Sequence, residues 1–296
     1  MSGISDGSPD NGRGSGIWST AYLPITVANL TIVATVGFGG LALIAALSTI
    51  AEDLGRVRLL PWVFTGHYAA SAIAVVVAGP VIDAVGIRRT FRATGIWLLV
   101  FTAAAAVAPS MLMLVFARTL QGFGVGFVFA VSTTTIGLSY PHELRRRAFA
   151  AQSVVFGVMG LGGPALAGVM LAFGGWRVVF ALQLPVTMIA LASGWTTLPT
   201  TRDRPSRIRT DWRGTGLLTF IVCSSLTAVS QVGVRWWAVG AAMAVTAVVV
   251  RMYWWHSGLV DAPVLAREHL NRFPLKWVHL TSGMAIFIAV GSDNFL

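Results

Sequence analysis

Long apolar windows recur along this chain, and they limit what it can fold into more than any other feature does. A helix needs about 20 apolar residues to cross the hydrocarbon core of a bilayer. Nine windows of roughly that length fall at 25–50, 61–82, 93–109, 111–138, 150–173, 176–198, 214–233, 236–254 and 277–296. Only 11% of the residues are charged, whereas soluble domains carry about 25%. We therefore expect an all-α integral membrane protein.

The basic residues are distributed unevenly around these windows. With the N-terminus in the cytoplasm, sixteen Lys and Arg residues fall in cytoplasmic segments and four outside, and Arg118 lies inside a window. Such asymmetry is typical of loops that face anionic lipid on the cytoplasmic side, so the net charge of +10 does not indicate nucleic acid as a partner. We expect a multi-pass protein with a cytoplasmic N-terminus. The bias towards arginine and alanine suggests a bacterial inner membrane.

Polar segments divide the chain into parts. Residues 1–16 are rich in Gly, Ser and Asp and lack a signal peptide, so we expect a disordered cytoplasmic tail. We then expect a six-helix bundle at 17–198, a cytoplasmic linker at 199–213, two extra transmembrane helices at 214–254, a cytoplasmic loop at 255–276, and the start of a second bundle at 277–296. The linker could alternatively be an amphipathic helix on the lipid surface, although it lacks a periodic apolar face.

The loop between the second and third windows has a distinctive pattern. Its glycine and charged residues are Gly79, Asp83, Gly86, Arg88 and Arg89. Glycines allow two helix ends to approach closely, and Asp83 can accept hydrogen bonds from backbone N–H groups or arginines. The pattern indicates a gating loop, although a helix-capping aspartate in a positive cytoplasmic loop would explain it too.

The fourth window contains Arg118 followed by Gln121, Gly122 and Gly126. An arginine at this depth costs about 2.5–3.5 kcal/mol on insertion scales, so it needs a polar cavity or hydrogen-bonded partners. Gln121 lies one turn away on the same face, and the glycines form a strip for close packing. We expect these residues on a transport pathway; the alternative is an arginine with a structural role only.

The fifth window carries Gly160, Gly163, Pro164 and Gly168, and Gly175-Trp-Arg177 opens the sixth. These motifs, the gating loop and the Arg118 helix occur together in an order that resembles the major facilitator superfamily. The glycine-proline pattern resembles its proton-antiporting branch, and the Gly-Trp-Arg pattern its fourteen-helix members. The resemblance implies a six-helix N-terminal bundle followed by about three further transmembrane helices.

One departure from the fourteen-helix drug:proton antiporters lies in the first window. They usually carry Asp, Thr and Asn there, and alignment puts Gly39, Leu41 and Ile44 at these positions. No acidic residue lies in the core of the first six windows, so Arg118 and His67 are their only embedded ionisable groups. His67 could relay protons near neutral pH. The alternative is a neutral packing residue, which is the more common role of such a histidine.

The expected function is therefore secondary transport: proton-coupled efflux of a small organic or amphiphilic solute by alternating access. We expect no enzyme, no cofactor and no metal site, because the sequence has no H-E-x-x-H spacing, nucleophile elbow or P-loop. The partners would be the lipid bilayer, the solute, protons and a C-terminal half that these windows do not complete. Without that half we expect the chain to be inactive alone. A non-transporting remnant or regulatory membrane protein is the alternative.

Overall fold

A computed structural model describes residues 16–198, 211–230, 235–260 and 263–264, and all its regular elements there are helices. The order is α1 (Leu23–Ala45), α2 (Leu47–Leu54), a 3-10 turn η1 (Val57–Leu59), α3 (Leu60–Val85), α4 (Ile87–Ala106), α5 (Met111–Ser139), α6 (His142–Gly174), α7 (Trp176–Ala181), α8 (Gln183–Thr197), α9 (Trp212–Ser230) and α10 (Trp236–His256). The all-α prediction is confirmed.

Six stretches in the described residues are long and apolar enough to cross a membrane. They are Leu23–Ala45, Val57–Val85, Met111–Ser139, His142–Gly174, Trp176–Thr197 and Trp236–His256. Helix α4 begins with three arginines in its first six residues, which lowers its mean hydropathy. In a bilayer every backbone polar group must be satisfied within the chain, and helices meet that requirement by themselves. The chain is an integral membrane protein of the α-helical kind.

Several helix bounds differ from the apolar windows. The first window breaks at Ala46 between α1 and α2, and the sixth breaks at Leu182 between α7 and α8. Helix α6 begins at His142, so the arginines expected in a loop lie in its first turns. Hydropathy marks only the lipid-facing part of a helix, and Glu143 in the first turn favours the earlier start. The ninth window and most of the predicted tail, linker and loop lie outside the described residues.

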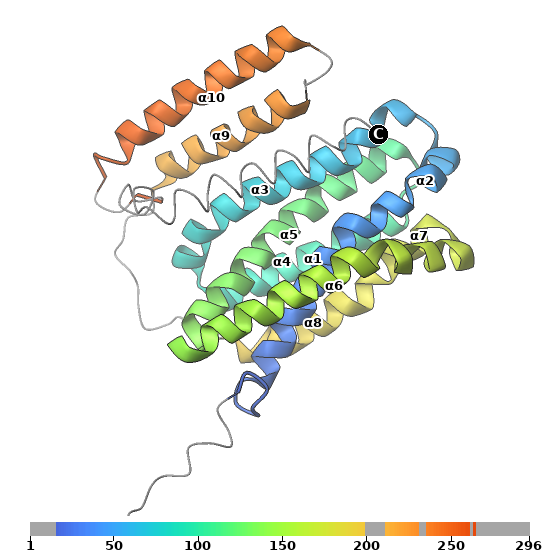
Figure 1. Cartoon of the computed structure of the whole chain (residues 1–296), viewed down its shortest axis with the longest axis horizontal. Coiled ribbons are helices and arrows are strands. Elements are labelled where there is room, and N and C mark those ends of the chain that lie inside the picture. Colours follow the sequence, from blue (N-terminus) through green and yellow to red (C-terminus); the bar gives the residue numbers. More distant parts are fainter. Residues whose placement is uncertain (1–15, 199–210, 231–234, 261–262, 265–296) are drawn as a thin grey trace, which may run out of the picture.

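The helices form one bundle with a pair of helices at its side (Figure 1). Helix α5 packs along α3 and α4, while α1 packs along α6 and α8. Helices α9 and α10 run antiparallel, and α9 contacts α3. The ends of this pair are joined by His256 Nε2 and Asp211 Oδ1, which lie 2.8 Å apart. Asp211 also caps α9 by accepting a hydrogen bond from the Gly214 N–H (2.8 Å).

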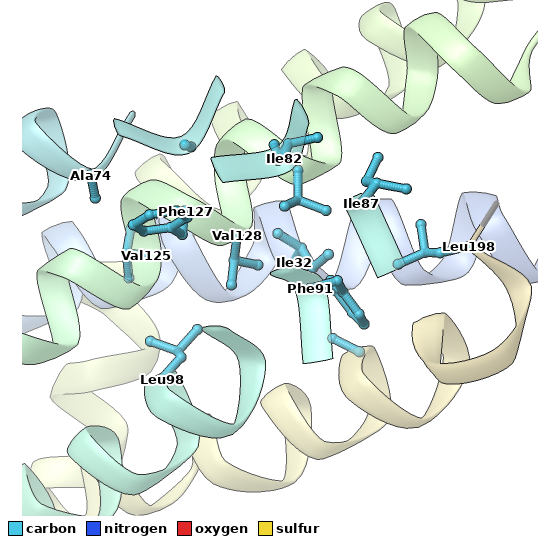
Figure 2. Close-up of a cluster of buried hydrophobic side chains, with 13 residues drawn as sticks. Ile32, Ala74, Ile82, Ile87, Phe91, Leu98, Val125, Phe127, Val128 and Leu198 are labelled. Carbon is cyan, nitrogen blue, oxygen red and sulfur yellow. The ribbon is translucent and has the colours of Figure 1, made fainter. Parts of the chain in front are cut away.

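The interior of the bundle has two main apolar layers. Figure 2 shows the first, where Ile32, Phe91, Leu98 and Val128 meet from α1, α4 and α5. The second gathers residues nearer the other ends of these helices, among them Leu43, Ala105, Met111, Leu114, Trp176 and Phe180. Helices α4 and α5 pass from one layer to the other, with Thr102 and Gln121 at positions in between. Gln183, at the start of α8, lies between Phe180 of the second layer and Ala190 of the first in the sequence.

Candidate functional site

Arg118 lies at the centre of the polar zone between the two apolar layers. Its side chain is 0% exposed. Its Nη1 donates to Gln121 Oε1 at 2.6 Å, one turn along α5. Gln121 Nε2 in turn donates to Thr102 Oγ1 on α4 at 2.8 Å and points towards Gln183 Oε1 on α8 at 3.5 Å. We call these four residues the Arg118 network; it joins α4, α5 and α8 inside the bundle.

His67 reaches the same zone from α3. Its Nδ1 lies 3.1 Å from the backbone carbonyl oxygen of Arg118. A carbonyl can only accept, so Nδ1 carries the hydrogen and donates it. The ring is buried, and it packs edge-on against Tyr68. The structure thus brings His67 to the main chain of Arg118 rather than into the Arg118 network.

Two glycines of α5 allow this approach of α3. A Cβ atom added to Gly122 would collide with the carbonyl group of His67, and one added to Gly126 would collide with the carbonyl group of Ser71. Both contacts are with backbone, which cannot move aside as a side chain can. The glycine strip therefore fixes the separation of α3 and α5 and holds His67 against Arg118.

The predicted gating loop is a loop at Gly86 alone, because α3 continues to Val85 and α4 begins at Ile87. Gly86 has a φ of 91°, a backbone conformation that side chains other than glycine rarely adopt. Asp83 and Gly79 are exposed on one face of α3, and no atom lies within 4 Å of a Cβ added to Gly79. Within the described residues Asp83 forms no ion pair. The close approach expected at Gly79 is not seen in this part of the chain.

The arginines of this turn bind the end of α8 instead. Arg88 Nε donates to the carbonyl of Leu198 and its Nη2 to that of Thr196, both at 2.7 Å. Arg92 donates to the carbonyl of Trp195 (2.6 Å) and lies over its ring. The last carbonyls of a helix have no partner within it and carry partial negative charge, so cations are favourable there. Arg89 is exposed.

The glycine-proline motif lies in the middle of α6, which runs through Pro164 without ending. Gly163 is buried, and a Cβ there would lie 3.8 Å from the side chain of Phe38 on α1. Gly160 is partly buried, while Gly168 is exposed with nothing within 4 Å. The motif therefore packs one side of α6 on α1 and leaves the other side open.

A second buried polar cluster was not predicted. Ser132 Oγ on α5 donates to Asn29 Oδ1 on α1 (2.6 Å) and accepts from Gln152 Nε2 on α6 (2.7 Å). Next to it, Thr26 and Tyr140 share a 2.7 Å hydrogen bond between their hydroxyls. The available signal was the presence of Asn and Gln in apolar windows, where unpaired amides are costly.

A third polar contact ties the opposite end of the bundle. Asp53, in the last turn of α2, accepts from Trp176 Nε1 (2.9 Å) and from Arg177 Nη1 (2.6 Å). These hydrogen bonds lower the pKa of Asp53 below its ordinary value of 3.8, the bond from Trp176 contributing most. Arg177 Nη2 also donates to the carbonyl of Ala108, after α4. The Gly-Trp-Arg motif thus joins the start of α7 to the last turn of α2 and to the residue that follows the end of α4 by two positions.

Within the described residues there is no group of three or more His, Cys, Asp or Glu side chains that could hold a metal ion. The polar zone consists of amides, hydroxyls, one guanidinium and one imidazole, which suit hydrogen bonding and proton exchange.

Comparison with known proteins gives consistent relatives. The chain is 32% identical over 162 residues to the multidrug resistance protein B homolog of Mycobacterium tuberculosis, covering 54% of this chain and 30% of that protein. It is 30% identical over 259 residues to a probable multidrug-efflux transporter of the same species, covering 82% of this chain and 52% of that protein. It is 29% identical over 150 residues to the multidrug efflux pump SdrM of Staphylococcus aureus, covering 49% of this chain and 33% of that protein.

The chain spans between 30% and 52% of the length of these relatives. The model of the Major Facilitator Superfamily matches residues 27–292, which include every described helix from α2 to α10 and most of α1. Together with the motifs on α3, α5 and α6, this match shows that the chain belongs to the Major Facilitator Superfamily.

Proposed function

We propose that this chain supplies the N-terminal six-helix half of a secondary transporter that exports a small organic or amphiphilic solute in exchange for protons. The observation that carries the proposal is the Arg118 network, in which a fully buried arginine of a superfamily bundle is hydrogen-bonded across three helices. A charged residue at membrane depth is expensive and marks a functional site by default. Relatives named for multidrug efflux support a drug-like solute.

Proton coupling is supported by the position of His67. His67 and Arg118 are the buried basic side chains in the described spanning helices. Because the imidazole donates to the carbonyl of Arg118, a change in its protonation acts directly on the helix turn that holds the arginine. We propose His67 as a relay that links proton binding to the conformation of α5. A neutral packing role would leave coupling unchanged in His67→Gln.

The open faces of α3 and α6 support alternating access. Gly79 and Asp83 on α3 and Gly168 on α6 are exposed, and no atom lies within 4 Å of a Cβ added to either glycine. Transporters of this kind rock two halves about a site near the middle of the membrane. We propose that these faces meet a second six-helix half, with the gating loop acting at the contact. The six-helix bundle would end at 198, and α9 and α10 would be extra helices beside it.

The orientation is also a proposal, with the N-terminus and the turn at Gly86 in the cytoplasm. It rests on the arginine asymmetry. After Cys223→Ser, a single cysteine at Gly174 should react with an impermeant thiol reagent added outside intact cells, and one at Ser206 should not. The reverse labelling pattern would show that the topology is opposite to the one proposed.

Transport itself can be tested with two preparations. In the first, the purified chain is reconstituted alone in liposomes with a pH gradient, and ethidium uptake is followed. In the second, the chain replaces the 259 aligned residues of the probable multidrug-efflux transporter of M. tuberculosis. We expect no flux from the chain alone, because the described residues provide one half, and gradient-dependent flux from the hybrid. Robust flux from the chain alone would refute the half-transporter proposal, and a correctly inserted but inactive hybrid would refute the transport function.

A further inference from the structure

Arg118 has hydrogen-bond donors that nothing in the described residues satisfies. A guanidinium has five N–H donors. Nη1 is bonded to Gln121, but Nε and Nη2 are buried and have no hydrogen-bond partner among the described residues. A buried donor without an acceptor costs about 1–3 kcal/mol, and more when it is charged. Two charged donor groups on one side chain, both without an acceptor among the described residues, indicate that an acceptor binds there.

The charge of Arg118 is also uncompensated. The ion pairs in the described part of the chain are Arg177–Asp53 and His256–Asp211, and neither involves Arg118. The ring of Phe180 lies 5.8 Å from the guanidinium carbon, near the limit for a cation–π contact. Gln121 offers only an amide dipole. The missing acceptor should therefore carry negative charge.

The surroundings offer neutral groups and some space. Gly39 on α1 faces the amide oxygen of Gln183 and has no side chain that could reach into the network. A small cavity lies among α1, α4, α5 and α8. Its lining includes Thr35, Leu98 and Thr187, each one helical turn from Gly39, Thr102 and Gln183 respectively. The cavity therefore lies about one helical turn from Thr102 and Gln183 of the Arg118 network.

We propose that Arg118 Nε and Nη2 bind an anion inside the six-helix bundle. The anion is either a free inorganic ion or the ionised acid group of the transported solute; only this second source rests on the proposed function. Charge-assisted hydrogen bonds from a guanidinium suit carboxylates and other small anions, and burial excludes the water that would compete with them.

The test measures thermal unfolding of the full-length chain in a neutral detergent, through its tryptophan fluorescence. Sodium chloride, sodium nitrate or sodium benzoate is titrated against sodium gluconate at constant ionic strength. A ligand that binds the folded state raises Tm with the logarithm of its concentration above Kd, and a concentration several times Kd corresponds to a shift of about 3 °C. Arg118→Gln should lose this shift. Arg251→Gln, an exposed arginine on α10, should keep it.

Gln121→Glu provides an independent variant. It places a carboxylate where Oε1 already accepts from Arg118, so the protein carries its own counter-ion and Tm should no longer depend on added anion. This variant decides the question should Arg118→Gln fail to fold. Shifts with chloride and nitrate identify a free inorganic anion, and a shift with benzoate alone identifies the acid group of a solute.

Equal Tm values in all four salts would refute the proposed anion site. A rise in Tm with added anion that persists in Gln121→Glu would refute it too. These measurements require no transport. An inactive hybrid with an intact anion shift would refute the proposed function and leave the site standing.

Discussion

The contact between α3 and α5 gives the sharpest prediction, because two glycines control it through backbone atoms. In Gly122→Ala the new methyl group would lie 2.8 Å from the Cα of His67, and in Gly126→Ala it would lie 2.7 Å from the Cβ of Ala74. Ordinary contact begins at 3.4 Å. Helix α3 must therefore move away from α5 by at least about 0.6 Å in either variant, since neither contact can be relieved by rotating a side chain.

The loss of stability in these two variants can be estimated from overpacking substitutions in other protein interiors. Forcing extra atoms into a well-packed interior costs about 1–3 kcal/mol, which offsets the gain of up to about 1 kcal/mol that alanine brings to a helix interior over glycine. Gly137 in the same helix is the matched control, because no atom lies within 4 Å of a Cβ placed there. Gly137→Ala should therefore be neutral or stabilising.

Thermal unfolding in detergent measures the difference. At about 2–4 °C per kcal/mol, the Tm of Gly122→Ala and of Gly126→Ala should lie about 2–12 °C below that of Gly137→Ala, which has the helix gain without the packing cost. Gly137→Ala itself should not lower Tm. The same variants should weaken the hydrogen bond from His67 to the carbonyl of Arg118, because α3 carries the imidazole. If Gly122→Ala and Gly126→Ala prove as stable as Gly137→Ala, the tight packing of α3 on α5 is not what holds this region together.

Two further predictions concern the helix ends. Because the pKa of Asp53 is lowered, its contacts stabilise the protein above its ordinary pKa of 3.8 and are lost as pH falls through the lower folded value. The Tm of Asp53→Asn should thus be below that of the wild type at pH 7 and converge with it near pH 3. The control variant Glu52→Gln should have the Tm of the wild type at every pH. Curves of Tm against pH that run parallel for Asp53→Asn and the wild type would contradict this. Arg88→Gln should free the last carbonyls of α8 and speed trypsin cleavage within residues 199–213 about fivefold, a loss of about 1 kcal/mol. Arg89→Gln, at an exposed neighbour, should not, and equal rates in both would refute the capping role.

Much of the fold could be predicted because lipid imposes a simple rule on the sequence. Each span needs a long apolar window, and the windows predicted the order of the long described helices, although not the breaks at Ala46 and Leu182. Within one helix, spacing was also informative: Gln121 follows Arg118 by three residues, and the two side chains share a 2.6 Å hydrogen bond.

Contacts between helices were not predictable in the same way. Thr102 and Gln183 complete the Arg118 network from α4 and α8, and nothing in an apolar window shows which of its faces turns inward. The partner of Arg88 was missed for a related reason. Its hydrogen bonds go to carbonyls at the end of α8, about 110 residues away in sequence, and backbone acceptors carry no side-chain signal.

The central claim, that Arg118 serves transport rather than folding alone, has one direct test. Proton-driven ethidium flux is measured in liposomes for the hybrid transporter with Arg118, with Arg118→Lys and with Arg118→Ala, after equal membrane insertion of all three has been established. We expect Arg118→Ala to abolish flux and Arg118→Lys to retain part of it, because a lysine keeps the charge but cannot reproduce the forked hydrogen bonding. Full flux in Arg118→Ala would show that this arginine is structural at most.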